Sequence, residues 1–515
     1  MERIEMNMFF MRNFVIALAV LAIVPVAAFS APSETANPAA WRPRERWRGF
    51  NLPGKAIKGS FSGKWFEDDL RMMHEFGFNF ARVPLDYRYW CQDDNPMSPD
   101  PKKFVSIDEM LAWGKKYKIH IQLCFTTAPG MDLKTRSKKA LFTNAAAQDA
   151  FAAYWAYIAR RYRNIPNDAL SFNLLNEPSA DASEENYLVF IKKLVSAIHV
   201  EDPKRFVVVD GLHWARNPHL ASIGLPVGQS HHAYSPSSVS HWRATWIRES
   251  MIRDVPAWPP SPVTSPIFGS RKPERQSPVV IENVPKGTLS ICTGLFNREV
   301  ELIVEADGKI LFSRFFQPSP NEPGWSNIVV RTDGAKKEWA GNLTEKTIRV
   351  KVPRCKRLSL RLGRGDWLDI SSIELSEDGK TAVLPFFAEW DYPRRRDMRF
   401  AGFGVKQPFV SADGTAYTGN TYLKEKTWDL WKPVLEAGQF VMVGEVGCYN
   451  KTPHGVALLW LEDNLRIFKE KGIGWAMWNF RGSMGIMDSG RTDVKYENYK
   501  GHKLDRKMLE LLQRY

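Results

Sequence analysis

The chain has 515 residues, of which 44% are hydrophobic, and it carries 71 Lys and Arg against 57 Asp and Glu, a formal net charge of +14. This composition excludes an intrinsically disordered chain, a collagen and a coiled coil, and the length is too great for one small domain. The basic residues are mixed with acidic ones and form no long tract. This pattern indicates a solvated surface, and we expect no nucleic-acid partner.

The N-terminus has the pattern of an export signal. Arg12 precedes an apolar run, Phe14–Val26, and the small residues Ala28 and Ser30 stand where a signal peptidase reads the chain. The run is too short to cross a bilayer, which takes about 20 residues. We therefore expect residues 1–30 to be removed as a signal peptide. The mature protein is then secreted, extracellular or periplasmic, and has no membrane contact.

The cysteines and the paired histidines are candidates for disulfides and for a metal site. The chain has five cysteines, an odd count for a secreted protein, so at least one thiol stays free. Cys292 and Cys355 lie in one segment and are a pair that could form a disulfide. His231 and His232 are adjacent, but no third ligand stands at a suitable spacing. A role of these histidines in hydrogen bonding, at the mouth of the barrel predicted below, is therefore favoured over a metal site. We expect no metal and no cofactor.

Short apolar runs alternate with helical periods through the first half of the chain. The runs typical of strands are Trp47–Leu52, Asn79–Pro84, His120–Phe125, Leu170–Leu175, Phe206–Val209 and Gly228–Ala233. The apolar residues that repeat at 4-3-4 spacing are Phe151, Trp155, Ile158 and Tyr162, and then Tyr187, Ile191, Leu194 and Ile198. Each set predicts one apolar helix face. Repeated units of strand and helix predict a parallel sheet covered by helices.

This alternation stops after Tyr234 and returns at Tyr422. In between, residues 259–399 are rich in Pro and show period-two alternation, which predicts an antiparallel β-sandwich. The clearest alternating runs are residues 357–362 and residues 300–312, the latter around a turn at Asp307-Gly308. The elements expected after Tyr422 are helices at Tyr422–Ala437 and Val456–Lys471 and strands at Phe440–Glu445 and Gly474–Asn479.

Six strands before the interruption and two after it complete a (β/α)8 barrel. We therefore predict an α/β fold, a TIM barrel formed by residues 31–258 and 400–515. The antiparallel β-sandwich of residues 259–399 is inserted between barrel strands six and seven.

In such a barrel the active site lies at the carboxyl ends of the strands. The residues expected there are Asn51, Arg82, Asn176, Glu177, His232, Tyr234, Glu445 and Trp478. Glu177 and Glu445 each follow an apolar run, where a buried carboxylate is costly unless it has a partner or a purpose. Two carboxyl groups facing one pocket suit glycosidic cleavage, because one protonates the leaving oxygen and the other attacks or stabilises the anomeric carbon.

The neighbours of these two glutamates fit the same chemistry. Arg82 is suited to keep one carboxylate ionised through charge-assisted hydrogen bonds. Asn176 can hydrogen-bond a sugar hydroxyl, and Trp478 can stack on a sugar ring.

The strand ends resemble glycoside hydrolase family 5, the cellulase family of retaining (β/α)8 enzymes, in its bacterial members. The matching stretches are residues 48–51, 80–88, 128–130, 171–178 with Asn176-Glu177-Pro178, 443–445, 475–480, 485–491 and 501–505. The resemblance spans about 40–255 and 420–515 and leaves the middle outside. Asn-Glu-Pro is a modest signal alone, but it is specific in this order with Arg82, Glu445 and Trp478.

This resemblance implies a role for each strand-end residue. Glu177 is the acid/base and Glu445 the nucleophile of a retaining double displacement. The residues expected to bind substrate or support the glutamates are Arg82 against Glu445, Asn176 on the sugar 2-hydroxyl, His232 and Tyr234 around Glu445, and Trp478 and Asn51 in the cleft. The implied protein is a secreted glycoside hydrolase that acts on a β-linked glucan or a related poly- or oligosaccharide. Its oligomeric state is left open.

Two positions depart from the family pattern. Thr126 stands where the related pattern has a His that lines the sugar site, and Val446 replaces an aromatic residue. These departures keep a second hypothesis open, a glycan-binding protein whose barrel site is weakened or inactive. Hydrolysis of cellulose, mixed-linkage glucan, mannan and xyloglucan separates the two.

The inserted segment also has two interpretations. Residues 365–375 resemble the late strands of galactose-binding-like jelly rolls, which often bind carbohydrate. The insert is then either a sandwich that walls the cleft or a glycan-binding module, with Trp325, Trp367 or Trp390 as sugar platforms. The apolar pattern around Trp367 favours a core position for that side chain.

Overall fold

The structure is a computed structural model of the chain. It describes residues 41–132, 137–179, 182–246, 255–259, 265–273, 276, 278–333, 336–384, 396–405, 407 and 418–515. The expected signal peptide, residues 1–30, and the expected sugar platform Trp390 lie outside the described residues. No helix within the described ranges combines the length and the apolar character that a bilayer crossing requires.

Eight parallel strands close into a barrel in the order β1-β18-β17-β6-β5-β4-β3-β2. Their bounds are β1 Arg48–Asn51, β2 Phe80–Asp86, β3 His120–Thr127, β4 Leu170–Asn173, β5 Val207–Asp210, β6 Gly228–Ala233, β17 Val441–Val446 and β18 Gly474–Met477. Each overlaps a strand expected from the apolar runs. The predicted TIM barrel is confirmed.

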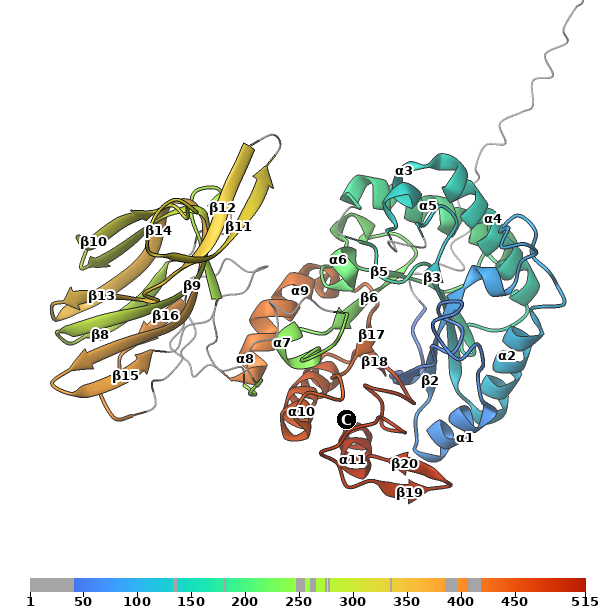
Figure 1. Cartoon of the computed structure of the whole chain (residues 1–515). Coiled ribbons are helices and arrows are strands. Elements are labelled where there is room, and N and C mark those ends of the chain that lie inside the picture. The colour runs from blue at the N-terminus through green and yellow to red at the C-terminus, as the bar shows by residue number, and fades with distance from the viewer. Residues whose placement is uncertain are drawn as a thin grey trace, which may run out of the picture.

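Helices surround the barrel (Figure 1). Their bounds are α1 Glu67–Glu75, α2 Val105–Tyr117, α3 Lys139–Thr143, α4 Ala145–Tyr162, α5 Glu184–Glu201, α6 Leu212–Ala215, α7 Ser237–Ser240, α8 Gly419–Leu423, α9 Asp429–Glu436, α10 His454–Glu470 and α11 Arg506–Arg514. The expected apolar faces of α4 and α5 are buried, as periodicity predicted. The helix expected at Tyr422–Ala437 is divided, because a π-helical turn, Lys424–Trp428, joins α8 to α9.

An aromatic cluster fills the amino-terminal end of the barrel. Trp47 stacks on Phe80 at 4.7 Å between ring centroids and meets Phe440 edge-on at 5.4 Å. His120 lies against Trp47 at 4.4 Å, and its burial lowers the pKa of His120 to about 3, so this imidazole is neutral. A packed amino-terminal end leaves the carboxyl ends of the strands for polar side chains.

A separate antiparallel β domain stands between β6 and β17 in chain order. Its strands are β7 Ser265–Phe268, β8 Val279–Val284, β9 Gly287–Ala306, β10 Lys309–Phe316, β11 Trp325–Asp333, β12 Lys336–Leu343, β13 Thr347–Val352, β14 Cys355–Glu377, β15 Lys380–Leu384 and β16 Arg396–Arg399. The predicted turn Asp307-Gly308 joins β9 to β10, with φ of +47° and +83°. The boundaries at 258/259 and 399/400 and the jelly-roll type stay predictions.

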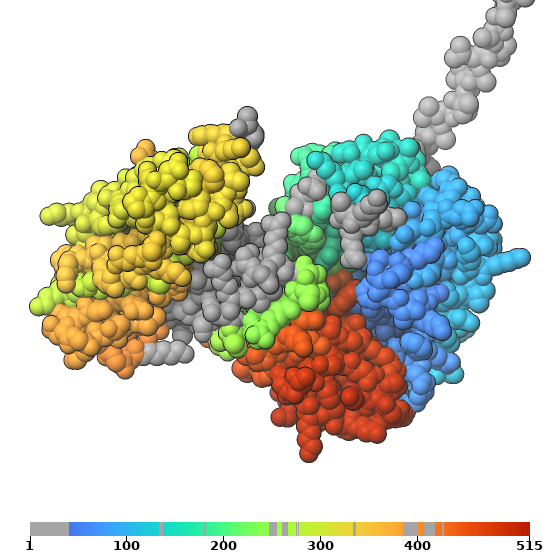
Figure 2. Space-filling model, in the orientation of Figure 1, coloured from blue at the N-terminus to red at the C-terminus, as the bar shows by residue number. Residues whose placement is uncertain are grey.

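The β domain has its own core. Leu358, Leu360 and Leu362 point to one face of β14 and are buried, which explains their period-two spacing. In the space-filling view of Figure 2, the β domain and the barrel are seen as two separate bodies.

Cys292 and Cys355, which could have formed a disulfide, are not bonded, because all five cysteines are free. Cys292 of β9 pairs with Ser372 toward one end of β14, whereas Cys355 begins β14 and pairs with Val284 of β8. The two thiols therefore lie toward opposite ends of the longest strand in the domain.

Two of the expected sugar platforms of the β domain lie among the described residues. Trp367 is only 8% exposed, in agreement with the core position that its pattern favoured. Trp325 is partly buried and meets Phe296 edge-on at 5.4 Å. Sugar binding by this domain stays a prediction.

Candidate active site

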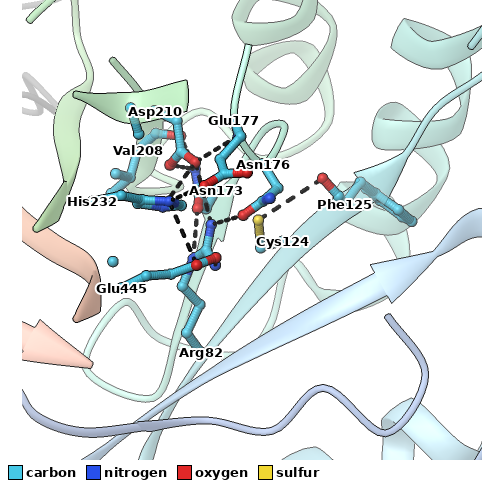
Figure 3. A network of polar contacts seen from close by, with 12 residues as sticks. Arg82, Cys124, Phe125, Asn173, Asn176, Glu177, Val208, Asp210, His232 and Glu445 are labelled. Atoms are coloured by element: carbon cyan, nitrogen blue, oxygen red, sulfur yellow. Dashed lines mark hydrogen bonds and ion pairs between the residues drawn. The ribbon is translucent and has the colours of Figure 1, made fainter. Parts of the chain in front are cut away.

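Arg82 stands at the centre of a polar network at the barrel mouth (Figure 3). The side chain is fully buried and comes from β2. Its guanidinium donates to Asn173 Oδ1 at 3.0 Å, Asn51 Oδ1 at 3.1 Å, Glu445 Oε1 at 2.9 Å, Asn176 Oδ1 at 2.7 Å and Asp210 Oδ2 at 3.3 Å. Burial opposes the charge, but the neighbouring acidic groups raise the pKa of Arg82 above its usual value. Arg82 is therefore a permanent cation that ties five strand ends together.

Glu445 lies on β17 with donors on both carboxylate oxygens. Arg82 donates to Oε1, and the Tyr234 hydroxyl donates to Oε2 at 2.8 Å. The side chain is 7% exposed. The strand register shifts beside Glu445, between Val443 and Val446 where β17 pairs with β18. Such irregularities re-aim side chains near functional sites.

Glu177 follows β4 in a left-handed conformation, with φ of +48°. Its backbone N–H donates to Asp210 Oδ2 at 2.9 Å, and its Oε1 lies 2.9 Å from Nδ1 of His232. Lys138 Nζ donates to the carbonyl oxygens of Asn176 and Glu177, the latter at 3.0 Å. The Glu177 side chain is 28% exposed, so it is open to the cleft while its backbone is held from two sides.

The two glutamates meet across His232. One oxygen of each carboxylate and one nitrogen of the imidazole lie within 4.8 Å of one another. A group of this kind could hold a metal ion. Arg82 already donates to Glu445, and the raised pKa of His232 favours a protonated imidazole, which cannot bind a metal. These two positive charges therefore compete with a metal cation for the carboxylates.

The electrostatics of the site couple these three groups. Burial lowers the pKa of His232, but Glu445 and Asp210 outweigh it and raise the pKa of His232 to about 10. Burial raises the pKa of Glu445, and the Glu177 charge acts in the same direction against His232 and Arg82. Burial is outweighed at Glu177, where the hydrogen bond and charge of His232 hold the pKa below its usual value. These surroundings thus favour a proton on Glu445 and the charged form of Glu177.

Comparison with known families agrees with this geometry. Residues 39–257 match the sequence model of the family described as "Cellulase (glycosyl hydrolase family 5)". The first six strands of the barrel therefore resemble glycoside hydrolase family 5. The match ends before β17, so Glu445 and Trp478 lie outside the matched residues, and closure of the barrel brings Glu445 beside Glu177 and His232.

Similar proteins include characterised enzymes. Endoglucanase C of Acetivibrio thermocellus is 28% identical over 190 residues, which is 36% of this chain and 54% of that endoglucanase. This chain therefore spans about half the length of the curated relatives that it matches. A crystal structure of a glycoside hydrolase aligns over 91% of this chain and 99% of its own, with TM-score 0.57 and 23% identity. Thermotoga maritima Cel5A, solved with cellobiose, aligns over 90% and 97%, with TM-score 0.51 and 13% identity, which shows a shared fold.

The other expected site residues lie at the carboxyl ends of the barrel strands. Asn51 is buried and donates to the Gly444 carbonyl at 2.8 Å while accepting from Arg82. Asn176 is partly exposed, and Trp478 is partly exposed after β18. Arg82 and His232 contact the glutamates, and Asn51 contacts Arg82 and the residue before Glu445. Direct contact of these three residues with substrate stays a prediction.

Thr126 occupies a wall of the cleft rather than its centre. It is 9% exposed, and its hydroxyl donates to the carbonyl oxygens of Leu85, at 2.9 Å, and Ala56. Its polar group is therefore used within the barrel wall. His231 lies outside the site, with Nδ1 2.9 Å from the Ala215 carbonyl oxygen.

Sequence reasoning missed three polar groups of this network. Asn173 and Asp210 are the last residues of β4 and β5, so the strand-end rule that found Glu177 and Glu445 could have found both. Asn173 Nδ2 donates to Asp210 Oδ1 at 3.0 Å. Lys138 precedes α3 and has no sequence signal, because its neighbours along the chain do not predict that it folds under Glu177.

An exposed tryptophan also stands beside the acid loop. His213, Trp214 and Ala215 have φ of +52°, +58° and +58°, and a left-handed conformation costs a non-Gly residue roughly 1–3 kcal/mol. The turn is held by the Trp214 N–H, which donates to the Pro178 carbonyl at 2.9 Å, and by the contact of His231 with Ala215. Trp214 is 46% exposed, and its backbone is bonded to Pro178, the residue that follows Glu177.

Proposed function

We propose that this protein is a secreted retaining glycoside hydrolase that cleaves a β-linked glucan or a related polysaccharide by double displacement. The observation that carries the proposal is the meeting of Glu177 and Glu445 within 4.8 Å at the barrel mouth. Carboxyl groups about 5–5.5 Å apart fit a covalent intermediate, whereas inversion needs about 6.5–9.5 Å to admit a water. Secretion rests on the export pattern of residues 1–30.

In the first step Glu445 attacks the anomeric carbon while Glu177 protonates the leaving oxygen. The C1–oxygen bond breaks, its electron pair goes to the oxygen, and a bond forms between C1 and a carboxylate oxygen of Glu445. Positive charge that develops at C1 favours an ionised Glu445, so in the proposed reaction the proton that the surroundings favour on Glu445 moves to Glu177, which delivers it to the leaving oxygen. Arg82 and Tyr234 fix the attacking carboxylate by their hydrogen bonds.

In the second step Glu177 acts as the base. It takes a proton from a water whose oxygen attacks C1, and Glu445 leaves as a carboxylate. Two inversions at C1 retain the anomeric configuration. Asn176 accepts from Arg82 through Oδ1, which directs its amide N–H groups toward the cleft for the sugar 2-hydroxyl.

The substrate class rests on the relatives. Endoglucanase C matches part of this barrel, and Thermotoga maritima Cel5A has been solved with cellobiose and with mannotriose. We therefore propose a β-linked glucan first and a β-mannan second. Thr126 changes one wall of the sugar site and leaves both glutamates in place, so we expect it to affect substrate choice and not to abolish turnover.

Retention of configuration is the expected stereochemical result. Incubation with cellulose, mixed-linkage glucan, mannan and xyloglucan should release reducing ends from at least one, and proton NMR of the first product should show the β-anomer before mutarotation. Hydrolysis with an α-anomer first would contradict the double displacement. Binding to these glycans with no hydrolysis of any would favour the glycan-binding alternative instead.

Trp214 is expected to bind the sugar on the leaving-group side of Glu177. An aromatic contact contributes about 0.5–1.5 kcal/mol, so Trp214→Ala should raise KM for oligosaccharides by about 3- to 10-fold and leave kcat within about 3-fold. The matched control is Val189→Ala on α5, which is also exposed, at 56%. Unchanged KM in steady-state assays of Trp214→Ala would remove this residue from the substrate site.

A further inference from the structure

Asp210 is a third carboxylate in the network that the proposed reaction does not use. It ends β5, is completely buried and has contacts on both oxygens. Oδ1 accepts from Asn173, and Oδ2 accepts from Arg82 and from the backbone N–H of Glu177. Burial would raise the pKa of Asp210, but the charges of His232 and Arg82 hold it below its usual value, so this carboxylate is an anion throughout the working pH range.

His232 joins this anion to the glutamates. Its Nε2 lies 3.2 Å from Asp210 Oδ2, while its Nδ1 lies 2.9 Å from Glu177 Oε1 and 3.6 Å from Glu445 Oε2. Nε2 is buried and has no aligned hydrogen bond to any described residue, so the Asp210 ion pair is what stabilises a proton there. A proton fixed on Nε2 leaves Nδ1 and the glutamates to exchange the other one.

We propose that Asp210 is a positioning residue of this reaction, which acts through His232 to keep in the cleft the proton that Glu177 delivers to the leaving oxygen. This inference rests on the proposed function. Asp210 keeps its charge in both steps. The proton leaves with the alcohol in the first step, and water restores it in the second.

Several other charged or titratable groups surround His232. The charged and titratable side chains that face it or its partners are Arg82 of β2, Cys124 of β3, Lys138 before α3, Glu177 after β4, Tyr234 after β6 and Glu445 of β17. Burial raises the pKa of Cys124 and of Tyr234, so both stay neutral. Arg82 and Lys138 repel a proton, and Glu177 and Glu445 change charge during the reaction. Asp210 is the anion that stays constant.

Asp210→Asn tests the inference with two aryl glycosides. On 4-methylumbelliferyl β-cellobioside the alkaline limb of kcat/KM should move down by about one to two pH units, because loss of the anion lowers the proton affinity of the His232 site. On 2,4-dinitrophenyl β-cellobioside, whose leaving group departs unprotonated, kcat at neutral pH should stay within about 3-fold. Asp202→Asn is the matched control, since Asp202 is a buried partner of Arg205, 2.8 Å away, outside the cleft.

Equal losses on both substrates with an unchanged alkaline limb would overturn the inference and assign Asp210 a structural role. A second measurement needs no folded Asp210 variant. The His232 signal of 15N-histidine-labelled wild-type protein can be assigned by its loss in His232→Gln. It should remain that of an imidazolium until the pH approaches the His232 pKa of about 10. Titration near the ordinary value of about 6.5 would overturn the inference. Wild-type protein that hydrolyses no glycoside would refute the proposed function, and the NMR titration, compared between wild-type protein and Asp210→Asn, would still decide the role of Asp210.

Discussion

Glu445→Gln is expected to lower kcat by on the order of 10⁴-fold or more, because the amide cannot form the covalent sugar intermediate. The substitution preserves the shape of the side chain and keeps an oxygen for Arg82 or Tyr234, the two donors of Glu445. Initial rates on the glycan that wild-type protein hydrolyses measure the loss. Mass spectrometry after treatment with a 2-fluoro β-cellobioside should find the label on Glu445 in wild-type protein.

A fold control accompanies this variant. Glu436→Gln removes an exposed carboxylate of α9 whose partner is Lys432, 3.5 Å away, and should retain wild-type turnover. Glu445→Gln should melt within a few degrees of wild type, because it also removes one of two adjacent buried charges. A label on another residue, or turnover within about 10-fold of wild type, would reject Glu445 as the nucleophile.

Glu177→Ala is expected to lower kcat/KM on polysaccharide by about 10²- to 10⁴-fold, the usual contribution of a general acid. The loss should shrink on 2,4-dinitrophenyl β-cellobioside, because that leaving group needs no proton. Azide should then accelerate turnover, since a small anion can enter the space of the lost carboxylate and attack C1 without a base. The product would be a β-glycosyl azide, identified by NMR.

The response to azide distinguishes Glu177→Ala from Glu445→Gln. Azide applied to Glu445→Gln should not yield a β-glycosyl azide, because its nucleophile and not its base is missing. Asn176→Ala should reduce turnover without azide rescue, since it removes a hydrogen-bonding group and no acid. Equal loss of Glu177→Ala on both aryl glycosides would contradict its role as the acid.

The barrel itself could be predicted because each of its elements has a local signal. The 4-3-4 spacing of Phe151 to Tyr162 commits that segment to a helix with one apolar face, and the buried runs before Glu177 and Glu445 are strands on the same grounds. The position of polar residues directly after those runs was enough to place them at one end of the barrel. The family match covers only the strands from β1 to β6, because it stops at residue 257.

The sequence left open whether Cys292 and Cys355 are bonded, because this depends on the tertiary structure. Shared membership of one segment says nothing about register, and Cys292 and Cys355 are separated along β14 by the way β9 pairs with it. Lys138 is a similar case, since the contact of its amine with the Glu177 carbonyl depends on how the chain folds after β3.

The order of the elements, their types and the acidic residues at two strand ends are properties of the local chain, because periodicity and turn chemistry act over a few residues. The partners of those acidic residues are set by closure of the barrel. His231 of β6 pairs with Val443 of β17, although the β domain separates these two strands along the chain. This pairing places His232 between Glu177 and Glu445 and against Asp210. Such contacts depend on strand register and on the burial of charge, which only the assembled barrel supplies.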